Sequence, residues 1–302
     1  SKYILRKIIF PLEVKMSKKH PVVAVTGSSG AGTTTVKRAF EHIFRREGIN
    51  AAVVEGDSFH KFDRAEMKIK MSEGLSHFGP EANEFGKLAE LFKTYGETGS
   101  GEKRYYLHSE DEALEHNKRL GTSKNPGEFT PWEKIPEGTD LMFYEGLHGL
   151  VKTSDINVSE FVDLGIGVVP IVNLEWIQKI ARDNAERGHS EEAIVDTILR
   201  RMPDYINHIT PQFSRTDINF QRVATVDTSN PFIARDIPSQ DESFVVIRFA
   251  DPKKFDTDFP YLISMLPDSF MSRRNTIVVP GGKMSIAMEI ILGPIIDQMM
   301  EK

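Results

Sequence analysis

The chain has 302 residues, of which 39% are hydrophobic and 27% are charged, a composition typical of a soluble globular protein with a sizeable core. Its net charge of −6 gives no reason to expect a nucleic acid or an anionic membrane as partner, and the absence of cysteine excludes disulfides, thiol nucleophiles and thiolate metal sites. No apolar run approaches the roughly 18–20 residues of a membrane span, and we expect a cytoplasmic protein.

The first fifteen residues are basic and apolar, and their apolar runs are broken by Arg6, Lys7 and Pro11. These runs are too short for the hydrophobic region of a secretion signal. We expect residues 1–15 to be a disordered or non-native tail; the alternative is an ordered arm used in contacts between subunits. Residues 16–302 contain no internal repeat and no clear linker, and we expect them to form a single domain.

An apolar run at residues 22–25 leads into a glycine-rich stretch, which is followed by a helical pattern. The stretch consists of Gly27, Ser28, Ser29, Gly30, Ala31, Gly32, Thr33, Thr34 and Thr35. This order is typical of a phosphate-binding loop, because converging backbone N–H groups and the helix dipole attract a phosphate. The spacing matches the Walker A pattern, and Thr34 takes the position of its Mg²⁺-binding hydroxyl, but Thr33 replaces its lysine. Either the stretch is a structural turn, or a lysine comes from elsewhere in the chain.

A second apolar run at residues 51–54 ends in the sequence EGDSFH, which contains Asp57 and His60. Doubly wound sheets bind their ligands just beyond the carboxyl ends of such strands. Asp57 is therefore a candidate catalytic carboxylate. The alternative is that Asp57 caps a helix that begins near Phe59.

Residues 61–104 are polar, with two expected helices at about 63–74 and 80–95, and a basic and aromatic strand is expected at 103–108. Four basic side chains of these segments would suit a substrate that carries its own phosphate, and the alternative is a solvated charged face. These side chains are Arg64, Lys103, Arg104 and His108. Residues 109–138 contain many glycines and prolines, and we expect an irregular excursion that covers the site.

A third hydrophobic run, at residues 141–146, ends in Glu145 and Gly146. A buried strand that ends in one acid has the form of a Walker B strand, whose carboxylate binds Mg²⁺ directly or through water. The signal is weak alone, but it follows a phosphate loop and another acidic strand end. A further strand is expected at residues 166–171.

Residues 174–188 predict a helix that ends at Gly188. Lys179, Arg182, Asp183 and Arg187 are spaced so that they share a face different from that of the apolar stripe. A basic face with one embedded acid is what a lid over a phosphate needs, and it offers the lysine missing from the loop. The alternative is an ordinary surface helix with ion pairs between successive turns.

The remaining pattern predicts a helix over 190–209 interrupted at Pro203, a buried strand at 244–249, a strand at 276–279 and a final helix at 283–300. Pro294 should kink or split that last helix. Strands that alternate with helices indicate an α/β fold with lid-like insertions.

Several of these stretches together resemble phosphoribulokinase of the bacterial class. They are GSSGAGTTT at 27–35, EGDSFH at 55–60, FYEGLHG at 143–149, GVVPIVNLEWIQKIARDNAERG at 167–188, and TDINFQRV and VDTSNPF within 216–232. The family's own loop also lacks the usual lysine. The resemblance implies a P-loop NTPase fold like that of adenylate, uridine and pantothenate kinases, with a mixed, mostly parallel sheet flanked by helices.

The resemblance also implies a reaction: transfer of the ATP γ-phosphoryl group to the 1-hydroxyl of ribulose 5-phosphate, which gives ribulose 1,5-bisphosphate for the Calvin cycle. Carried over by motif, Asp57 is the general base, and Lys179, Arg182 and Asp183 are catalytic. The loop residues bind ATP, and Thr34, Glu145 and Asp183 bind Mg²⁺. The substrate-binding residues would be His60, Arg64, Tyr105, His108 and Arg187.

Members of the bacterial class are octamers, activated by NADH and inhibited by AMP, so the resemblance implies a homo-oligomer with an effector site. By weak positional matching, its arginines would be Arg45, Arg46, Arg201 and Arg235. Two other functions stay open at this point. One is a sister kinase acting on uridine or pantothenate, and the other is a nucleotide-binding regulator without turnover.

Overall fold

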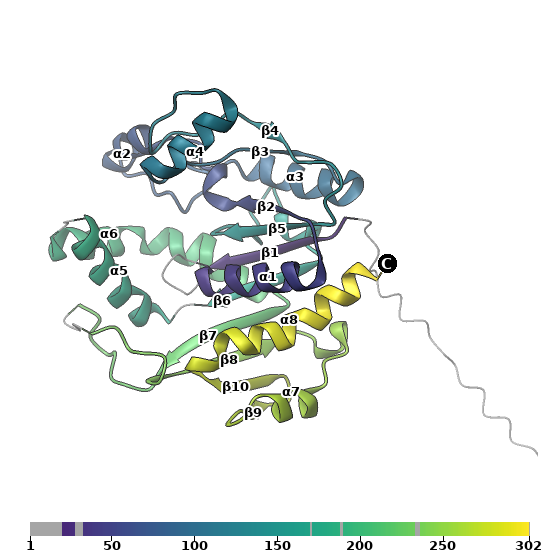
Figure 1. The fold of residues 1–302 in the computed structure, drawn as a ribbon. Coiled ribbons are helices and arrows are strands. Elements are labelled where there is room, and N and C mark those ends of the chain that lie inside the picture. Colours follow the sequence, from purple (N-terminus) through teal and green to yellow (C-terminus); the bar gives the residue numbers. More distant parts are fainter. Residues whose placement is uncertain (1–19, 28–32, 170, 188–189, 233–235, 302) are drawn as a thin grey trace, which may run out of the picture.

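A single eight-stranded sheet forms the centre of the computed structural model, which describes residues 20–27, 33–169, 171–187, 190–232 and 236–301 (Figure 1). In sheet order, the strands are β2 (Ala51–Glu55), β5 (Leu141–Gly146), β1 (Val22–Gly27), β6 (Leu164–Val169), β7 (Ile218–Ala224), β8 (Ser243–Phe249), β10 (Thr276–Pro280) and β9 (Phe270–Arg273). The strands from β2 to β7 are parallel, and the last three pair antiparallel. The mixed α/β fold expected from the sequence is confirmed.

Helices cover both faces of the sheet (Figure 1). They are α1 (Thr33–Glu47), α2 (Arg64–Ser72), α3 (Phe85–Thr98), α4 (Glu110–Leu120), α5 (Val172–Arg187), α6 (Glu191–Asp204), α7 (Phe259–Met265) and α8 (Met284–Met300). None of the helices in the described part of the chain has the length and apolar character that crossing a membrane requires. Figure 1 places α5 and α6 beyond the carboxyl ends of the parallel strands.

The hydrophobic core lies in two layers, one on each face of the sheet. Successive residues of β1 point to opposite faces, so Val23 and Val25 pack with α1 and α8, while Val22 and Ala24 pack with α3. All four side chains are fully buried, as expected for a parallel strand covered on both sides. This packing fixes β1 and places its carboxyl end, where the glycine-rich stretch begins, at the middle of one sheet edge.

Three expectations about individual elements were wrong, and a fourth was wrong in part. Residues 109–138 are not irregular throughout, because Ser109 caps α4 and Gly121, at φ 66°, ends it. β8 is buried on one face only, since Phe244 is 38% exposed while Val245 and Ile247 are fully buried. Pro294 does not split the last helix, because it lies inside a continuous α8; a kink there stays a prediction. The expected strand at 103–108 is reduced to the two-residue β3 (Glu102–Lys103), paired with β4 (Glu133–Lys134).

A fully buried glutamine joins three segments near the carboxyl ends of the strands. The Gln212 amide donates to the carbonyls of Leu147 (2.8 Å) and His208 (2.9 Å), and its oxygen accepts from the Thr26 hydroxyl (3.1 Å) and the Leu150 N–H (3.0 Å). Every hydrogen-bonding position of the amide is therefore used. Gln212 links the end of β1 to the loop that follows β5.

Gln212→Leu is expected to reduce the free energy of unfolding by about 3 kcal/mol or more, because each buried polar group left without its partner costs about 1–3 kcal/mol. Urea denaturation followed by circular dichroism measures the change. Gln298→Leu, at an exposed position of α8, is the matched control and should change stability by less than about 0.5 kcal/mol. Equal effects of the two substitutions would contradict the role assigned to Gln212.

Candidate active site

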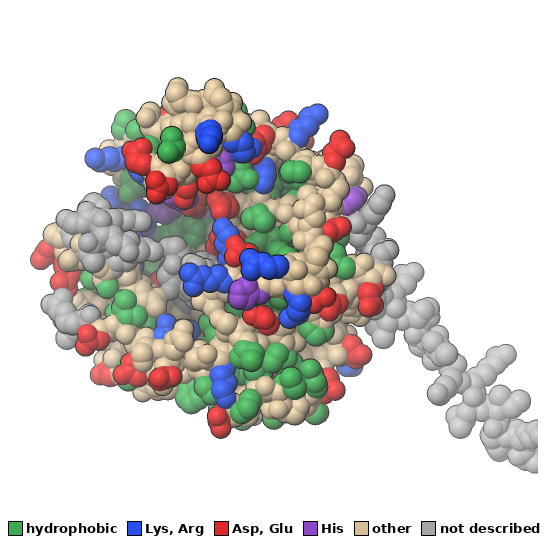
Figure 2. Space-filling model, in the orientation of Figure 1, with side chains coloured by type: hydrophobic (Ala, Val, Ile, Leu, Met, Phe, Trp, Pro, Cys, Tyr) green, Lys and Arg blue, Asp and Glu red, His purple; other side chains and the backbone are tan. Residues whose placement is uncertain are grey.

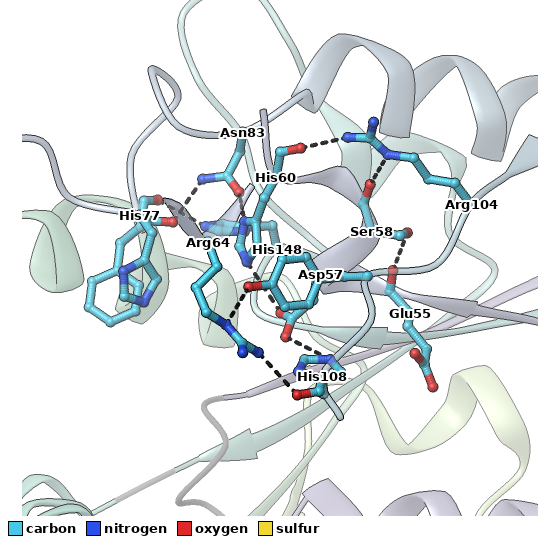
Figure 3. A network of polar contacts seen from close by, with 12 residues as sticks. Glu55, Asp57, Ser58, His60, Arg64, His77, Asn83, Arg104, His108 and His148 are labelled. Atoms are coloured by element: carbon cyan, nitrogen blue, oxygen red, sulfur yellow. Dashed lines mark hydrogen bonds and ion pairs between the residues drawn. The ribbon is translucent and has the colours of Figure 1, made fainter. Parts of the chain in front are cut away.

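Asp57 lies in a single 3-10 turn, η1 (Gly56–Phe59), directly after β2. It does not cap a helix. The next helix, α2, begins at Arg64 and is capped by Asp63, whose side chain forms a capping box with Glu66. The carboxylate of Asp57 instead faces His60 Nε2 at 3.4 Å and His108 Nε2 at 3.6 Å (Figure 3). The structure therefore brings together three residues that the sequence placed in one site.

The orientation of His60 is set by Asn83, a buried residue that the sequence reasoning did not select. The Asn83 amide donates to the carbonyls of His77 (2.8 Å) and Gly79 (2.7 Å), so its oxygen is left to accept from His60 Nδ1 at 2.8 Å. The other ring nitrogen of His60 then points at Asp57. Asn83 lies 23 residues from His60, and no local motif marks it.

The charges of Asp57 and His60 stabilise each other. Burial alone would raise the pKa of Asp57, but the hydrogen bond and charge of His60, with a further contribution from His108, hold the pKa below its usual range. Burial alone would lower the pKa of His60, but the hydrogen bond and charge of Asp57 raise it. At neutral pH, Asp57 is therefore ionised and available to accept a proton.

His60→Gln should move the acid limb of the pH–rate profile toward higher pH. The substitution removes a hydrogen bond and a charge that lower the pKa of Asp57, so its carboxylate is protonated at a higher pH than in the parent enzyme. The pH dependence of kcat/KM measures the shift. His42→Gln is the control, because His42 is exposed on α1 and contacts Glu289. An acid limb that stays in place in both variants would contradict the coupling.

Two further histidines lie deeper in the same region. Burial lowers the pKa of His148 to about 3, and its Nε2 donates to the carbonyl of Phe78 at 2.9 Å. Burial, together with the charges of Arg201 and His60, also lowers the pKa of His77 well below its usual value. Both rings are therefore neutral at physiological pH. The His148 ring hydrogen-bonds, and the His77 ring packs on Phe78 at 4.7 Å.

The carboxyl ends of β2 and β5 approach each other closely. A Cβ on Gly56 would lie 2.8 Å from the Cα of Gly146 and 2.5 Å from the Tyr144 hydroxyl, so only glycine fits there. Glu55 and Glu145 are directly paired in the register of the two strands. Lys37 on α1 contacts Glu55 at 3.1 Å; burial would lower the pKa of Lys37, but Glu55 and Glu145 raise it.

The glycine-rich stretch falls partly outside the described residues, which exclude 28–32. On either side, Gly27 ends β1, and Thr33, Thr34 and Thr35 open α1, which carries no acid in its first turn. The strand and helix expected around a phosphate loop are therefore present. The positive end of the α1 dipole points toward the stretch.

α5 and α6 form a small unit of their own, in which Ile180 packs with Ile194 and Ile198. Lys179 contacts Asp183 at 2.5 Å one turn further along α5, and Asp183 is only 4% exposed. The side chains of Arg182 and Arg187 lie outside the described residues. The pair on α5 is thus partly buried, unlike the fully exposed pair of an ordinary surface helix.

Arg64 and the neighbouring aromatic residues lie next to His108, one of the two histidines that face Asp57. Arg64 donates to the Tyr106 hydroxyl (3.3 Å) and to the carbonyl of His108 (3.1 Å). The Tyr106 ring lies 4.9 Å from the ring of His108. Tyr105, which the sequence reasoning selected, packs instead on His116 at 4.3 Å; its role in binding stays a prediction, and Tyr106 is the tyrosine in contact with the site.

The arginines matched to an effector site that lie among the described residues are on two different helices. Arg45 and Arg46 lie in the last turn of α1, where Arg46 faces Glu289 of α8 at 3.9 Å. Arg201 lies on α6 and contacts Met71 of α2. Arg235 lies outside the described residues. The effector site therefore stays a prediction.

The carboxylates available for a cation lie at the strand ends and on α5. In the residues that the structure describes, no cluster of three or more acidic or histidine side chains forms a complete metal cage. Mg²⁺ usually binds one or two carboxylates and takes its other ligands from water and phosphate oxygens. The position of Glu145 at the end of β5, beside the glycine-rich stretch, fits such a site.

Three comparisons agree with this geometry. Residues 22–229 match the profile of the Phosphoribulokinase / Uridine kinase family. The chain is 60% identical over 294 residues to the chromosomal phosphoribulokinase of Cupriavidus necator, covering 95% of this chain and 98% of that protein. It is 58% identical over 292 residues to a probable phosphoribulokinase of Escherichia coli, covering 95% of this chain and 98% of that protein.

Among solved structures, a phosphoribulokinase from Rhodobacter spheroides superposes with a TM-score of 0.84 at 53% identity, covering 94% of this chain and 99% of that one. The similarity therefore spans nearly the whole of both chains, in sequence and in fold. With the family profile covering more than half of the residues, the chain belongs to the phosphoribulokinase and uridine kinase family.

Proposed function

We propose that this protein is a phosphoribulokinase, which transfers the γ-phosphoryl group of Mg-ATP to the 1-hydroxyl of ribulose 5-phosphate. The observation that carries the proposal is the ionised Asp57, held between His60 and His108 at the carboxyl edge of the sheet. Identity of 55–60% to several phosphoribulokinases over nearly full length supports the same reaction. Its product, ribulose 1,5-bisphosphate, belongs to the Calvin cycle.

Phosphoryl transfer requires the protein mainly to position the two substrates and to neutralise the charge of the phosphoryl group. The substrate hydroxyl oxygen bonds to the γ-phosphorus, the bond from that phosphorus to the bridging oxygen breaks, and ADP leaves. The hydroxyl proton passes to the carboxylate of Asp57. Lys179 and Arg182 neutralise charge on the group in transfer.

Binding of the two substrates is divided between the two sides of Asp57. Residues 27–35 bind the phosphates of ATP. Thr34, Glu145 and Asp183 would hold Mg²⁺, which would supply further neutralisation of phosphate charge. The basic residues around Arg64 suit a sugar that carries a phosphate group. A nucleoside or pantothenate acceptor would carry no phosphate. The sugar phosphate is bound by His60, Arg64, Tyr105, His108 and Arg187.

Assembly and regulation follow the bacterial class in this proposal: a cytoplasmic homo-octamer, activated by NADH and inhibited by AMP, with Arg45, Arg46, Arg201 and Arg235 at the effector site. An exposed apolar surface supports self-association. Figure 2 shows hydrophobic side chains gathered over α7 and β9, where Tyr261, Met265 and Phe270 are between 45% and 51% exposed.

The test is ADP release with Mg-ATP and ribulose 5-phosphate, with and without NADH, in a coupling system that does not itself consume NADH. Turnover that rises with NADH supports the substrate and the effector together. Turnover without a response to NADH supports the kinase activity and contradicts the proposed effector site. ATP binding without turnover would contradict the proposal and point to a sister kinase or a non-catalytic regulator. Assays with uridine and pantothenate as acceptors would distinguish these two, because only a sister kinase would release ADP.

A further inference from the structure

Two consecutive cations lie along the outer edge of β2, the strand that ends in the turn of Asp57. β2 is the last strand of the described sheet, so one row of its backbone groups faces no other strand. Lys103 is 9% exposed, and its amine donates to the carbonyl of Val53 at 3.0 Å. Arg104 extends further, to the turn itself. These contacts are with the chain's own carbonyls, and neither cation is part of a solvated charged face.

Arg104 contacts the backbone on the far side of Asp57 at two points (Figure 3). Its Nε donates to the carbonyl of Ser58 at 2.8 Å, and its Nη2 donates to the carbonyl of His60 at 2.7 Å. The planar guanidinium can make both contacts at once, which a single ammonium group cannot do with the same fixed geometry. The two bonds tie together the segment that carries both members of the Asp57–His60 pair.

The guanidinium is itself held in place by aromatic rings. It lies 3.7 Å from the centre of the Phe129 ring and 4.7 Å from that of Trp132. Trp132 in turn meets the edge of Phe59, which is 2% exposed and belongs to the same turn. Arg104 thus connects the turn to the 129–132 segment through both hydrogen bonds and ring contacts.

From these contacts we infer that Arg104 is a positioning residue for phosphoryl transfer: it fixes residues 56–60 so that Asp57 and His60 keep their geometry. The inference rests on the proposed function, in which Asp57 is the base. Arg104 acts through the backbone and contacts no part of the phosphate loop among the described residues. Its loss should therefore lower kcat and leave the KM for ATP unchanged.

The experiment compares Arg104→Met, Arg104→Lys and Lys103→Met in steady-state kinetics and thermal unfolding. Because a shift of about 1 Å in a reacting group can cost about 10²-fold, Arg104→Met should lower kcat by about 10–100-fold with KM for ATP within about threefold. Arg104→Lys should be intermediate, since lysine keeps the charge and one bond. Lys103→Met, which loses the equivalent contact one residue earlier, should be less stable but keep kcat within about threefold.

Three results would overturn the inference. One is a kcat of Arg104→Met within threefold of that of the parent enzyme. Another is a loss of kcat in Lys103→Met as large as that in Arg104→Met, which would indicate that Arg104 has a merely structural role. The third, an unchanged kcat in Arg104→Lys, decides the question even where Arg104→Met does not fold. Asp57→Asn is measured in the same series. If Asp57→Asn stays active, Asp57 is not the base, and both the proposed mechanism and this inference fail. If Asp57→Asn is inactive while Arg104→Met is fully active, only this inference is overturned.

Discussion

The Asp57→Asn enzyme is expected to lose about 10²–10⁴-fold in kcat, the range that positioned proton transfer contributes to enzymatic rates. Asparagine has nearly the same shape and still hydrogen-bonds, but it cannot take the proton from the substrate hydroxyl. His60 and His108, which face Asp57 at 3.4 and 3.6 Å, remain to bind the sugar phosphate. KM for both substrates should therefore change little. Steady-state kinetics with ribulose 5-phosphate and Mg-ATP measures the two constants separately.

A second half-buried carboxylate supplies the control for this substitution. Asp217 contacts Lys254 at 2.7 Å and accepts from the Gly165 N–H at 2.8 Å, at the amino end of β7 and away from the site. Asp217→Asn should lower stability and keep kcat. If Asp57→Asn raised KM and left kcat intact, Asp57 would be a binding group, and the base would have to be sought elsewhere.

Local patterns in the sequence predicted the strand ends at which the site lies. The acids Asp57 and Glu145 each follow a buried run, and parallel strands bring their carboxyl ends to one edge of a sheet. The choice between base and cap for Asp57 needed the structure, because Asp63 is an equally good cap only six residues later and forms the capping box. Sequence alone could not decide which of two nearby aspartates caps the helix.

The supporting contacts could not be predicted because their partners are far apart along the chain. Asn83 reaches His60 across 23 residues, Arg104 reaches Ser58 across 46, and Gln212 reaches Thr26 across 186. Each depends on how loops fold back onto the sheet. Tyr105 and Tyr106 show a different difficulty: neighbouring residues of an extended segment point to opposite sides, so an error of one position exchanges the two environments.

Lys179→Met is expected to lower kcat by about 10²–10³-fold, or about 3–4 kcal/mol, the effect of removing one preorganised electrostatic stabiliser. Thr33 stands where a phosphate loop usually has its lysine, so the positive charge must come from another segment. Lys179 is a candidate because Asp183, buried one turn away, contacts its amine at 2.5 Å and can orient it. Initial rates at saturating Mg-ATP and ribulose 5-phosphate give the comparison.

Two matched lysines separate this role from a general loss of charge. Lys254→Met breaks the partly buried pair with Asp217, so it should reduce stability without reducing kcat. Lys37 is the competing source of the charge, since it lies on α1 next to the phosphate loop, but it contacts Glu55 at 3.1 Å and its charge is balanced there. If Lys37→Met lost activity while Lys179→Met stayed within tenfold of the parent enzyme, the catalytic lysine would come from α1, and Lys179 of α5 would have no catalytic role.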